Sequence, residues 1–139
     1  MKVIIDTKVL ISAAISGRTP EAVLLWVVDR RDVEWIVSSD ILMEYKALLS
    51  RPRFQLSSTQ QERWFEVLDE ATALVTVNLE TDFPRDQKDA KFLSCAWASE
   101  ADFLITGDRN LSEAQDLIET QIVSVSLFHR LIRELENSK

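Results

Sequence analysis

Short apolar runs rich in valine and isoleucine alternate along the chain with longer stretches of helical spacing. The runs span residues 2–5, 33–37, 74–77, 102–106 and 122–125, and each has the length and composition of a buried strand. In the stretches between them, apolar residues recur every three or four positions, as on the inner face of a helix. This alternation predicts an α/β domain whose mainly parallel sheet is covered by helices on both faces.

Capping signals indicate where the main helices begin. Helices are predicted over about residues 20–30, 40–51, 60–71, 86–99 and 127–135. Thr19 would be the N-cap of the first helix, with proline at the first helical position. Ser39 or Asp40 would cap the second, and a capping box that starts at Thr59 would open the third. Residues 41–73 hold two helices with no strand between them, so the strand order does not follow from the sequence.

Length and composition indicate one domain, which we take to span residues 1–139. The longest apolar stretches, residues 9–15 and 22–28, fall well short of the roughly 20 residues that a bilayer span needs. The first apolar run is short and leads straight to Asp6, so no secretion signal is visible. The single cysteine, Cys95, cannot form an internal disulfide. We therefore expect a cytoplasmic protein with no membrane segment.

The net charge is −7, from 23 acidic and 16 basic residues, so the chain lacks the strongly basic surface of many nucleic-acid-binding proteins. Contact with nucleic acid would be local, through basic side chains beside one cleft or through a bound cation. The basic residues that could form such a rim are Arg51, Arg53, Arg85, Lys88, Lys91 and Arg109. Most of them are equally well explained as solvated charges. Arg85 and Arg109 lie closest in sequence to the acidic residues described next.

Four carboxylates follow the predicted strands at the points where helices begin. Asp6 ends the first strand, and Asp108 follows the strand over 102–106 after a single glycine. Glu44 lies early in the helix after the second strand, and Asp89 lies near the start of a later helix. In an open parallel sheet, the ligand crevice lies beyond the carboxyl ends of the strands. All four side chains are therefore expected at one edge of the sheet.

Two of these carboxylates differ in how far they turn toward the core. Asp89 shares the apolar stripe of its helix, so it faces inward and needs a backbone donor, a cation or a metal as partner. Glu44 lies about 100° from the middle of the apolar stripe of its helix and only borders the core. Simpler roles stay open. Asp6 and Asp108 would each cap a following helix, Asp89 would suit a helix N-terminus, and Glu44 would be solvated.

Carboxylates that converge need compensation, from a cation, a basic neighbour or raised pKa values. Two of them about 5 Å apart repel by roughly 3 kcal/mol at an effective dielectric constant of about 20. An oxygen-only ligand set that includes water suits Mg²⁺ or Mn²⁺ far better than zinc. The chemistry expected of such a site is the metal-assisted hydrolysis of phosphodiesters.

Three sequence segments occur in order: KVIIDTKVLISA, IVSSDILMEYKALLSRPRF and FPRDQKDAKFLSCAWASEADFLITGDRNL. Together they resemble PIN-domain proteins, in particular the VapC-like toxins of bacterial toxin–antitoxin pairs. The resemblance implies a three-layer sandwich with a five-stranded parallel sheet between helices. It also implies a ribonuclease that depends on Mg²⁺ or Mn²⁺ and acts on RNA. An antitoxin partner and a homodimer are further expectations.

Matched residue by residue, the resemblance assigns catalysis and metal binding to the same acidic positions: Asp6, Glu44, Asp89 and Asp108. Thr106 fills the usual hydroxyl position of the family. Lys8 departs from the pattern, because the family usually reads DTNVL where this chain reads DTKVL. Its ammonium would compete with the metal, hold an RNA phosphate together with Arg85 and Arg109, or lie along the surface.

Two other functions stay open. A PIN fold that is weak or silent in catalysis would act as a binding module, through an antitoxin or an RNA partner. A phosphorylated receiver domain also opens with a strand that ends in aspartate. Such a domain has a phosphoacceptor aspartate after its third strand, whereas this chain has Asn78, Leu79 and Glu80 there. The sequence therefore argues against a receiver domain.

Overall fold

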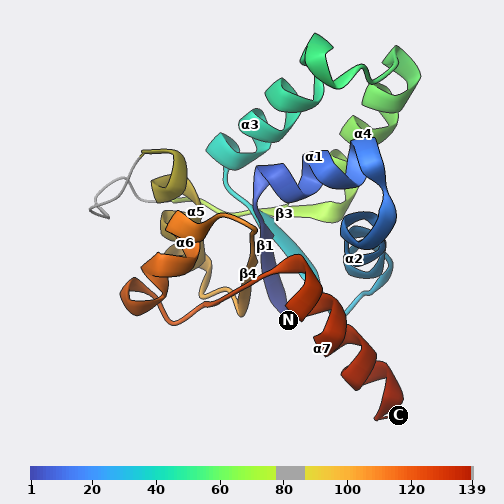
Figure 1. Ribbon diagram of the computed structural model, residues 1–139. Coiled ribbons are helices and arrows are strands. Elements are labelled where there is room, and N and C mark those ends of the chain that lie inside the picture. Colours follow the sequence, from blue (N-terminus) through green and yellow to red (C-terminus); the bar gives the residue numbers. More distant parts are fainter. Residues whose placement is uncertain (78–86, 139) are drawn as a thin grey trace.

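The computed structural model describes residues 1–77 and 87–138, which form one sheet flanked by helices (Figure 1). The five strands of the described residues are β1 (Lys2–Ile5), β2 (Glu34–Val37), β3 (Thr72–Leu74), β4 (Phe103–Ile105) and β5 (Gln121–Val123). The helices are α1 (Thr7–Ser16), α2 (Arg18–Asp29), α3 (Ser39–Leu49), α4 (Ser58–Ala71), α5 (Gln87–Ser99), α6 (Arg109–Ser112) and α7 (Val125–Asn137), with the short 3₁₀ helices η1 (Pro52–Phe54) and η2 (Glu113–Leu117). The strand order is β3-β2-β1-β4-β5, and all adjacent strands are parallel.

Helices cover both sides of this sheet, which confirms the predicted three-layer α/β fold. In Figure 1, α1, α2 and α7 lie on one side of the strands, and α5 and α6 lie on the other. Packing agrees with this view, because α2 contacts α1 and α7 while α5 contacts β1 and β2. Across the described residues, no helix is both long and apolar enough to cross a bilayer.

The central strand β1 lies between β2 and β4, and its inner residues are fully buried. Backbone pairing continues one residue past the strand ends. The Asp6 N–H donates to the Ile105 carbonyl at 2.9 Å, and the Thr106 N–H donates to the Val123 carbonyl at 2.9 Å. These bonds fix the backbone at the points where β1 and β4 leave the sheet.

Two predicted helix starts are wrong because earlier residues provide the N-cap. Helix α2 begins at Arg18, directly after Gly17, so Thr19 lies inside the helix. Gly17 has a φ of +68°, a conformation that glycine adopts without steric cost, and it separates α1 from α2. At α3, the cap is Ser38, whose hydroxyl accepts from the Ile41 N–H at 3.2 Å.

The capping box of α4 also lies earlier than predicted. The Gln60 N–H donates to the Ser57 hydroxyl at 3.1 Å, and the Ser57 N–H donates to the Gln60 side chain at 2.8 Å. Residues 57–60 and 59–62 both fit the sequence pattern of a capping box. The extended backbone of Ser57 makes it the N-cap, so Thr59 is helical.

The outer strands also begin earlier than predicted. Strand β3 starts at Thr72, directly after α4, because residues 72–74 pair with β2. Strand β5 ends at Val123 because Ser124 caps α7, whose first residue is Val125 rather than residue 127. The predicted start of the helix over 86–99 lies outside the described residues, which enter α5 at Gln87.

Candidate active site

Asp6 stands where the central strand β1 ends and α1 begins. It is buried, with only 5% of the residue exposed. Although Asp6 is the N-cap residue of α1, its side chain makes no capping hydrogen bond. The structure thus shows no side-chain capping bond for this carboxylate, although the Lys8 backbone N–H lies near it.

Thr106 joins Asp6 to the adjacent strand end. Its buried hydroxyl donates to Asp6 Oδ2 at 2.6 Å and accepts from the Asp108 backbone N–H at 2.9 Å. Because β1 and β4 are neighbours in the sheet, residues 100 positions apart in sequence meet here. One hydroxyl thus fixes the Asp6 carboxylate and the backbone that carries Asp108.

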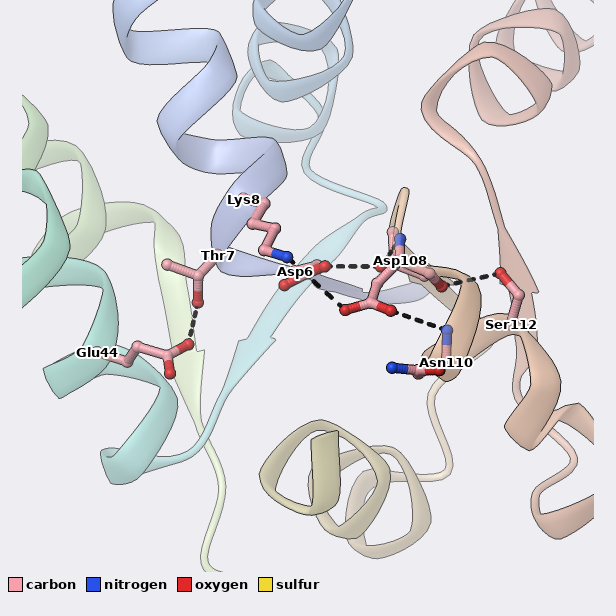
Figure 2. Close-up of polar contacts among 8 residues, drawn as sticks. Asp6, Thr7, Lys8, Glu44, Asp108, Asn110 and Ser112 are labelled. Carbon is pink, nitrogen blue, oxygen red and sulfur yellow. Dashed lines mark hydrogen bonds and ion pairs between the residues drawn. The ribbon is translucent and has the colours of Figure 1, made fainter. Parts of the chain in front are cut away.

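Asp108 has two kinds of contact at the start of α6. Its Oδ1 accepts from the Asn110 N–H at 2.8 Å, which confirms the capping role that the sequence left open. Its Oδ2 lies 3.9 Å from Lys8 Nζ. Figure 2 shows Asp6, Asp108 and Lys8 grouped together beyond the ends of β1 and β4. The capping bond therefore leaves one carboxylate oxygen of Asp108 on the side of Asp6.

Lys8 lies at the outside of this group. Its side chain is 81% exposed, and the 3.9 Å separation from Asp108 Oδ2 is long for an ion pair. Water and salt screen an ammonium in this position, so it balances the two carboxylates weakly. Lys8 is therefore not buried between Asp6 and Asp108.

Burial raises the pKa of the Asp6 carboxyl above its ordinary value. The Thr106 hydroxyl, the nearby Lys8 backbone N–H and the Lys8 ammonium favour the ionised form, while the Asp108 carboxylate disfavours it. The net direction is upward, so these partners do not offset the loss of water around Asp6. A divalent cation would supply the missing positive charge, and carboxylate oxygens are the donors that hard cations prefer. The Asp6 and Asp108 pair therefore fits such an ion.

Glu44 belongs to a neighbouring group, in which both of its carboxylate oxygens have partners. Oε1 accepts from Lys91 Nζ at 2.8 Å, and Oε2 accepts from the Thr7 hydroxyl. Figure 2 shows Glu44 directed toward Thr7 and set apart from Asp108. Glu44 is therefore not the solvated helix residue that the sequence left open.

The next residue, Tyr45, fixes α3 to the sheet. Its fully buried hydroxyl donates to the Ile5 carbonyl and accepts from Trp35 Nε1 at 3.3 Å. Since Tyr45 follows Glu44 and Ile5 precedes Asp6, this hydrogen bond links the backbone beside Glu44 to the backbone beside Asp6.

Asp89 is buried in the first turn of α5, as its place on the apolar stripe predicts. Among the residues that the structure describes, no group of three or more histidine, cysteine, aspartate or glutamate side chains is close enough to hold a metal ion. The structure thus joins Asp6 to Asp108 through Thr106 and gives Glu44 a counter-ion of its own. It does not gather all four carboxylates into one ligand cluster.

The predicted basic rim is described only in part. Lys91 is not a solvated rim residue, because it is paired with Glu44. Arg109 is exposed at the first residue of α6, directly after Asp108. Arg85 and the side chain of Lys88 lie outside the part of the chain that the structure describes.

A family model for the PIN domain matches residues 2–110, which include all four candidate carboxylates. The chain belongs to the PIN-domain family. PIN domains generally use divalent metal ions, which agrees with the donor chemistry of Asp6 and Asp108. The family resemblance expected from the sequence is thereby confirmed.

Individual proteins similar to this PIN domain include an uncharacterized protein of Methanocaldococcus jannaschii, which is 29% identical over 132 residues, 93% of this chain and 83% of its own length. Solved structures that share the fold include two VapBC proteins. The structure of VapBC2 from Rickettsia felis, bound to a DNA fragment from their promoter, matches with a TM-score of 0.62 and 12% identity over 89% of this chain and 98% of its own. VapBC-1 from nontypeable Haemophilus influenzae matches with a TM-score of 0.59 and 18% identity, over 91% of this chain and 99% of its own.

Sequence reasoning missed the contacts of Glu44 with Lys91 and Thr7. A usable signal was present, because a glutamate that borders an apolar stripe is partly buried and needs a partner. The identity of that partner depends on the packing of α3 against α1 and α5. Nothing in the local pattern of this PIN domain gives that packing.

Proposed function

We propose that this PIN domain is a metal-dependent ribonuclease that hydrolyses RNA phosphodiester bonds and acts as the toxin of a toxin–antitoxin pair. The observation that carries the proposal is the Asp6–Thr106–Asp108 arrangement, in which a buried carboxylate lacks full charge compensation. Mg²⁺ or Mn²⁺ suits such carboxylate ligands together with water. When bound, the cation would polarise a substrate phosphate and favour deprotonation of the attacking water.

The acidic residues of the proposed site have distinct tasks. Asp6, Asp89 and Asp108 are assigned to hold the cation, and Glu44 to complete the site or orient water. Thr106 keeps Asp6 and the backbone of Asp108 in place through its two hydrogen bonds. Preorganisation of this kind reduces the rearrangement that binding requires.

Three basic residues are assigned to hold the RNA backbone. Lys8 and Arg109 are exposed beside Asp108. In this position, each side chain is free in solvent to contact a phosphate of the RNA. Arg109 offers a planar fork of donors, whereas Lys8 offers a point charge. Arg85 is assigned to the same task from its place in the sequence alone.

The toxin assignment is an analogy from the fold. The two solved structures described above are named as VapBC proteins, one of them bound to promoter DNA. We therefore assign this chain an antitoxin protein as partner and a cytoplasmic location, with a second copy of the chain as a further candidate partner.

Cleavage of RNA by the purified protein, with Mn²⁺ or Mg²⁺ and then with EDTA, tests the proposal. Wild type is expected to cleave only with the divalent ion. Asp6→Asn and Asp108→Asn are each expected to lower the rate by about a hundredfold to a thousandfold, because each removes a charge from the cation site. Asp116→Asn, at an exposed position in η2, is the matched control and is expected to cleave at the wild-type rate. Full cleavage by both site variants, with folding checked by thermal unfolding, would overturn the proposal.

A second candidate function is a binding module with a PIN fold and little or no catalysis. The observation that favours it is that no compact group of three metal-binding side chains occurs among residues 1–77 and 87–138. Such a module would act through an antitoxin or an RNA partner. Robust Mn²⁺-dependent cleavage by purified wild type excludes it.

A further inference from the structure

The Glu44 carboxylate differs from Asp6 and Asp108 because a lysine already balances its charge. Lys91 Nζ lies 2.8 Å from Glu44 Oε1, and the two side chains are only 25% and 24% exposed. An ion pair with this little water around it is held more firmly than a surface pair, since removal of either partner leaves a poorly solvated charge.

The second oxygen of Glu44 is also engaged. Oε2 accepts from the hydroxyl of Thr7, a buried residue that directly follows Asp6. The carboxylate is therefore held from α1 and from α5 at the same time, while α3 supplies its backbone. A direct bond to a metal ion would require one of these partners to leave.

We propose that Lys91 is a positioning residue that serves as the permanent counter-ion of Glu44, so that Glu44 contributes to the site as half of a neutral pair and is not a direct ligand of the divalent cation. This inference rests on the proposed function, because it concerns the same site. We call the sheet edge that carries Asp6, Glu44 and Asp108 the acidic edge. The inference divides it into two halves. The half around Asp6 and Asp108 takes up an external cation, and the half around Glu44 already has Lys91 as its cation.

The same pair positions a second acidic residue. Lys91 lies two residues after Asp89 in the first turns of α5, and its bond to Glu44 joins this part of α5 to α3. The two helices also pack against each other. Lys91 thus fixes the start of the helix that carries Asp89.

Isothermal titration calorimetry with Mn²⁺ alone, on the full chain, tests this inference. In Lys91→Met the Glu44 charge is released, so Mn²⁺ is expected to bind about tenfold more tightly than in wild type. Lys91→Arg restores the counter-ion and is expected to restore wild-type affinity. Glu44→Gln is expected to change the affinity by less than about threefold, because the pair it disrupts is neutral overall and not a ligand.

Two further variants serve as controls. Lys46→Met also removes a lysine from a short ion pair, because Lys46 Nζ lies 2.7 Å from Asp69 Oδ1. Asp69 is not one of the proposed site residues, so the Mn²⁺ affinity of this variant is expected to match wild type. Asp108→Asn removes a proposed ligand and is expected to abolish Mn²⁺ binding. If Lys91→Met does not fold, the double variant Lys91→Met/Glu44→Gln removes both charges together and is expected to bind Mn²⁺ as wild type does.

The outcomes separate this inference from the proposed function. It is overturned if Lys91→Met binds Mn²⁺ no more tightly than wild type, or if Glu44→Gln or the double variant weakens binding as much as Asp108→Asn. If wild type binds no Mn²⁺ but Lys91→Met does, the counter-ion role of Lys91 stands and the proposed metal-dependent function fails. If neither protein binds Mn²⁺, both fail.

Discussion

The two halves of the acidic edge have similar residues and different charge balance. Beside Asp6 and Asp108, the Lys8 side chain is 81% exposed, and its ammonium lies 3.9 Å from Asp108 Oδ2. Around Glu44, the Lys91 side chain is only 25% exposed, and its ammonium lies 2.8 Å from the carboxylate. Among the described residues, Asp6 and Asp108 therefore have only a distant, exposed lysine, whereas Glu44 has a close counter-ion.

This difference shows that neighbours, more than residue type, decide which carboxylates suit a cation. A buried carboxylate without full compensation favours either a proton or a metal ion, and the raised pKa of Asp6 reflects this preference. A carboxylate with a half-buried lysine partner at 2.8 Å already has its charge balanced. The account predicts that loss of the Asp6 or Asp108 carboxylate weakens metal binding far more than loss of the Glu44 carboxylate.

Loss of the Thr106 hydroxyl is expected to have the largest effect among the variants that keep all site charges. Thr106→Val removes the bond to Asp6 and leaves the Asp108 N–H without its acceptor. We expect a loss of about 1–3 kcal/mol in the free energy of unfolding. RNA cleavage is expected to fall about tenfold to a hundredfold, as for other residues that orient metal ligands.

Thr120→Val is the matched control for this prediction. Thr120 is also buried, and its hydroxyl donates to the Ala101 carbonyl at 2.7 Å, away from the acidic edge. A similar loss of stability with unchanged cleavage is expected. Equal losses of cleavage in Thr106→Val and Thr120→Val would show that Thr106 acts only through stability.

The pKa of Asp6 predicts a smaller effect, on stability and its pH dependence. Because the folded pKa is raised, stability from the protonated carboxyl is fully present below the unfolded value near 3.8 and is lost as pH rises through the folded pKa. Asp6→Asn mimics the protonated form and can still accept from Thr106. In EDTA at neutral pH, its Tm is therefore expected to exceed that of wild type by a few degrees.

Thermal unfolding across pH checks the sign of this effect. The difference in Tm between Asp6→Asn and wild type is expected to shrink as pH falls and to vanish below the unfolded pKa. Asp116→Asn, exposed in η2, is expected to show no such difference. A lower Tm for Asp6→Asn at neutral pH would mean that the ionised Asp6 is well compensated without a metal.

The smallest effect is expected at Lys8. Its side chain is 81% exposed, so Lys8→Asn is expected to change Mn²⁺ affinity by less than about threefold. A modest rise in KM for RNA, with kcat unchanged, is expected if Lys8 holds a phosphate. A tenfold or larger gain in Mn²⁺ affinity would instead show that Lys8 competes with the metal.

The sequence predicted the parts of this site that depend on local pattern. A polar residue that ends a buried run lies at the end of a strand, so the positions of Asp6 and Asp108 at strand ends followed from hydrophobic pattern alone. The burial of Asp89 followed from the 3.6-residue period of its helix. The five strands were likewise predicted, although β3 was placed two residues and β5 one residue too late.

The rest depends on contacts between segments that are distant in sequence. The adjacency of β1 and β4, which brings Thr106 to Asp6, could not be derived because strand order is a property of the whole chain. The pairing of Lys91 with Glu44 depends on how α5 packs on α3, and the sequence offered only a basic rim or a solvated charge for Lys91. Lys8 was open to three interpretations because only the structure shows how exposed its ammonium is.

The central claim is that a divalent cation binds at Asp6 and Asp108 while Glu44 keeps Lys91 as its partner. Anomalous scattering from crystals soaked in Mn²⁺ measures this most directly. The account predicts one peak in contact with Asp6 and Asp108, with the Glu44–Lys91 ion pair intact. A peak bonded to Glu44 with Lys91 displaced, or no peak at Asp6 and Asp108 in crystals that take up the ion, would contradict it.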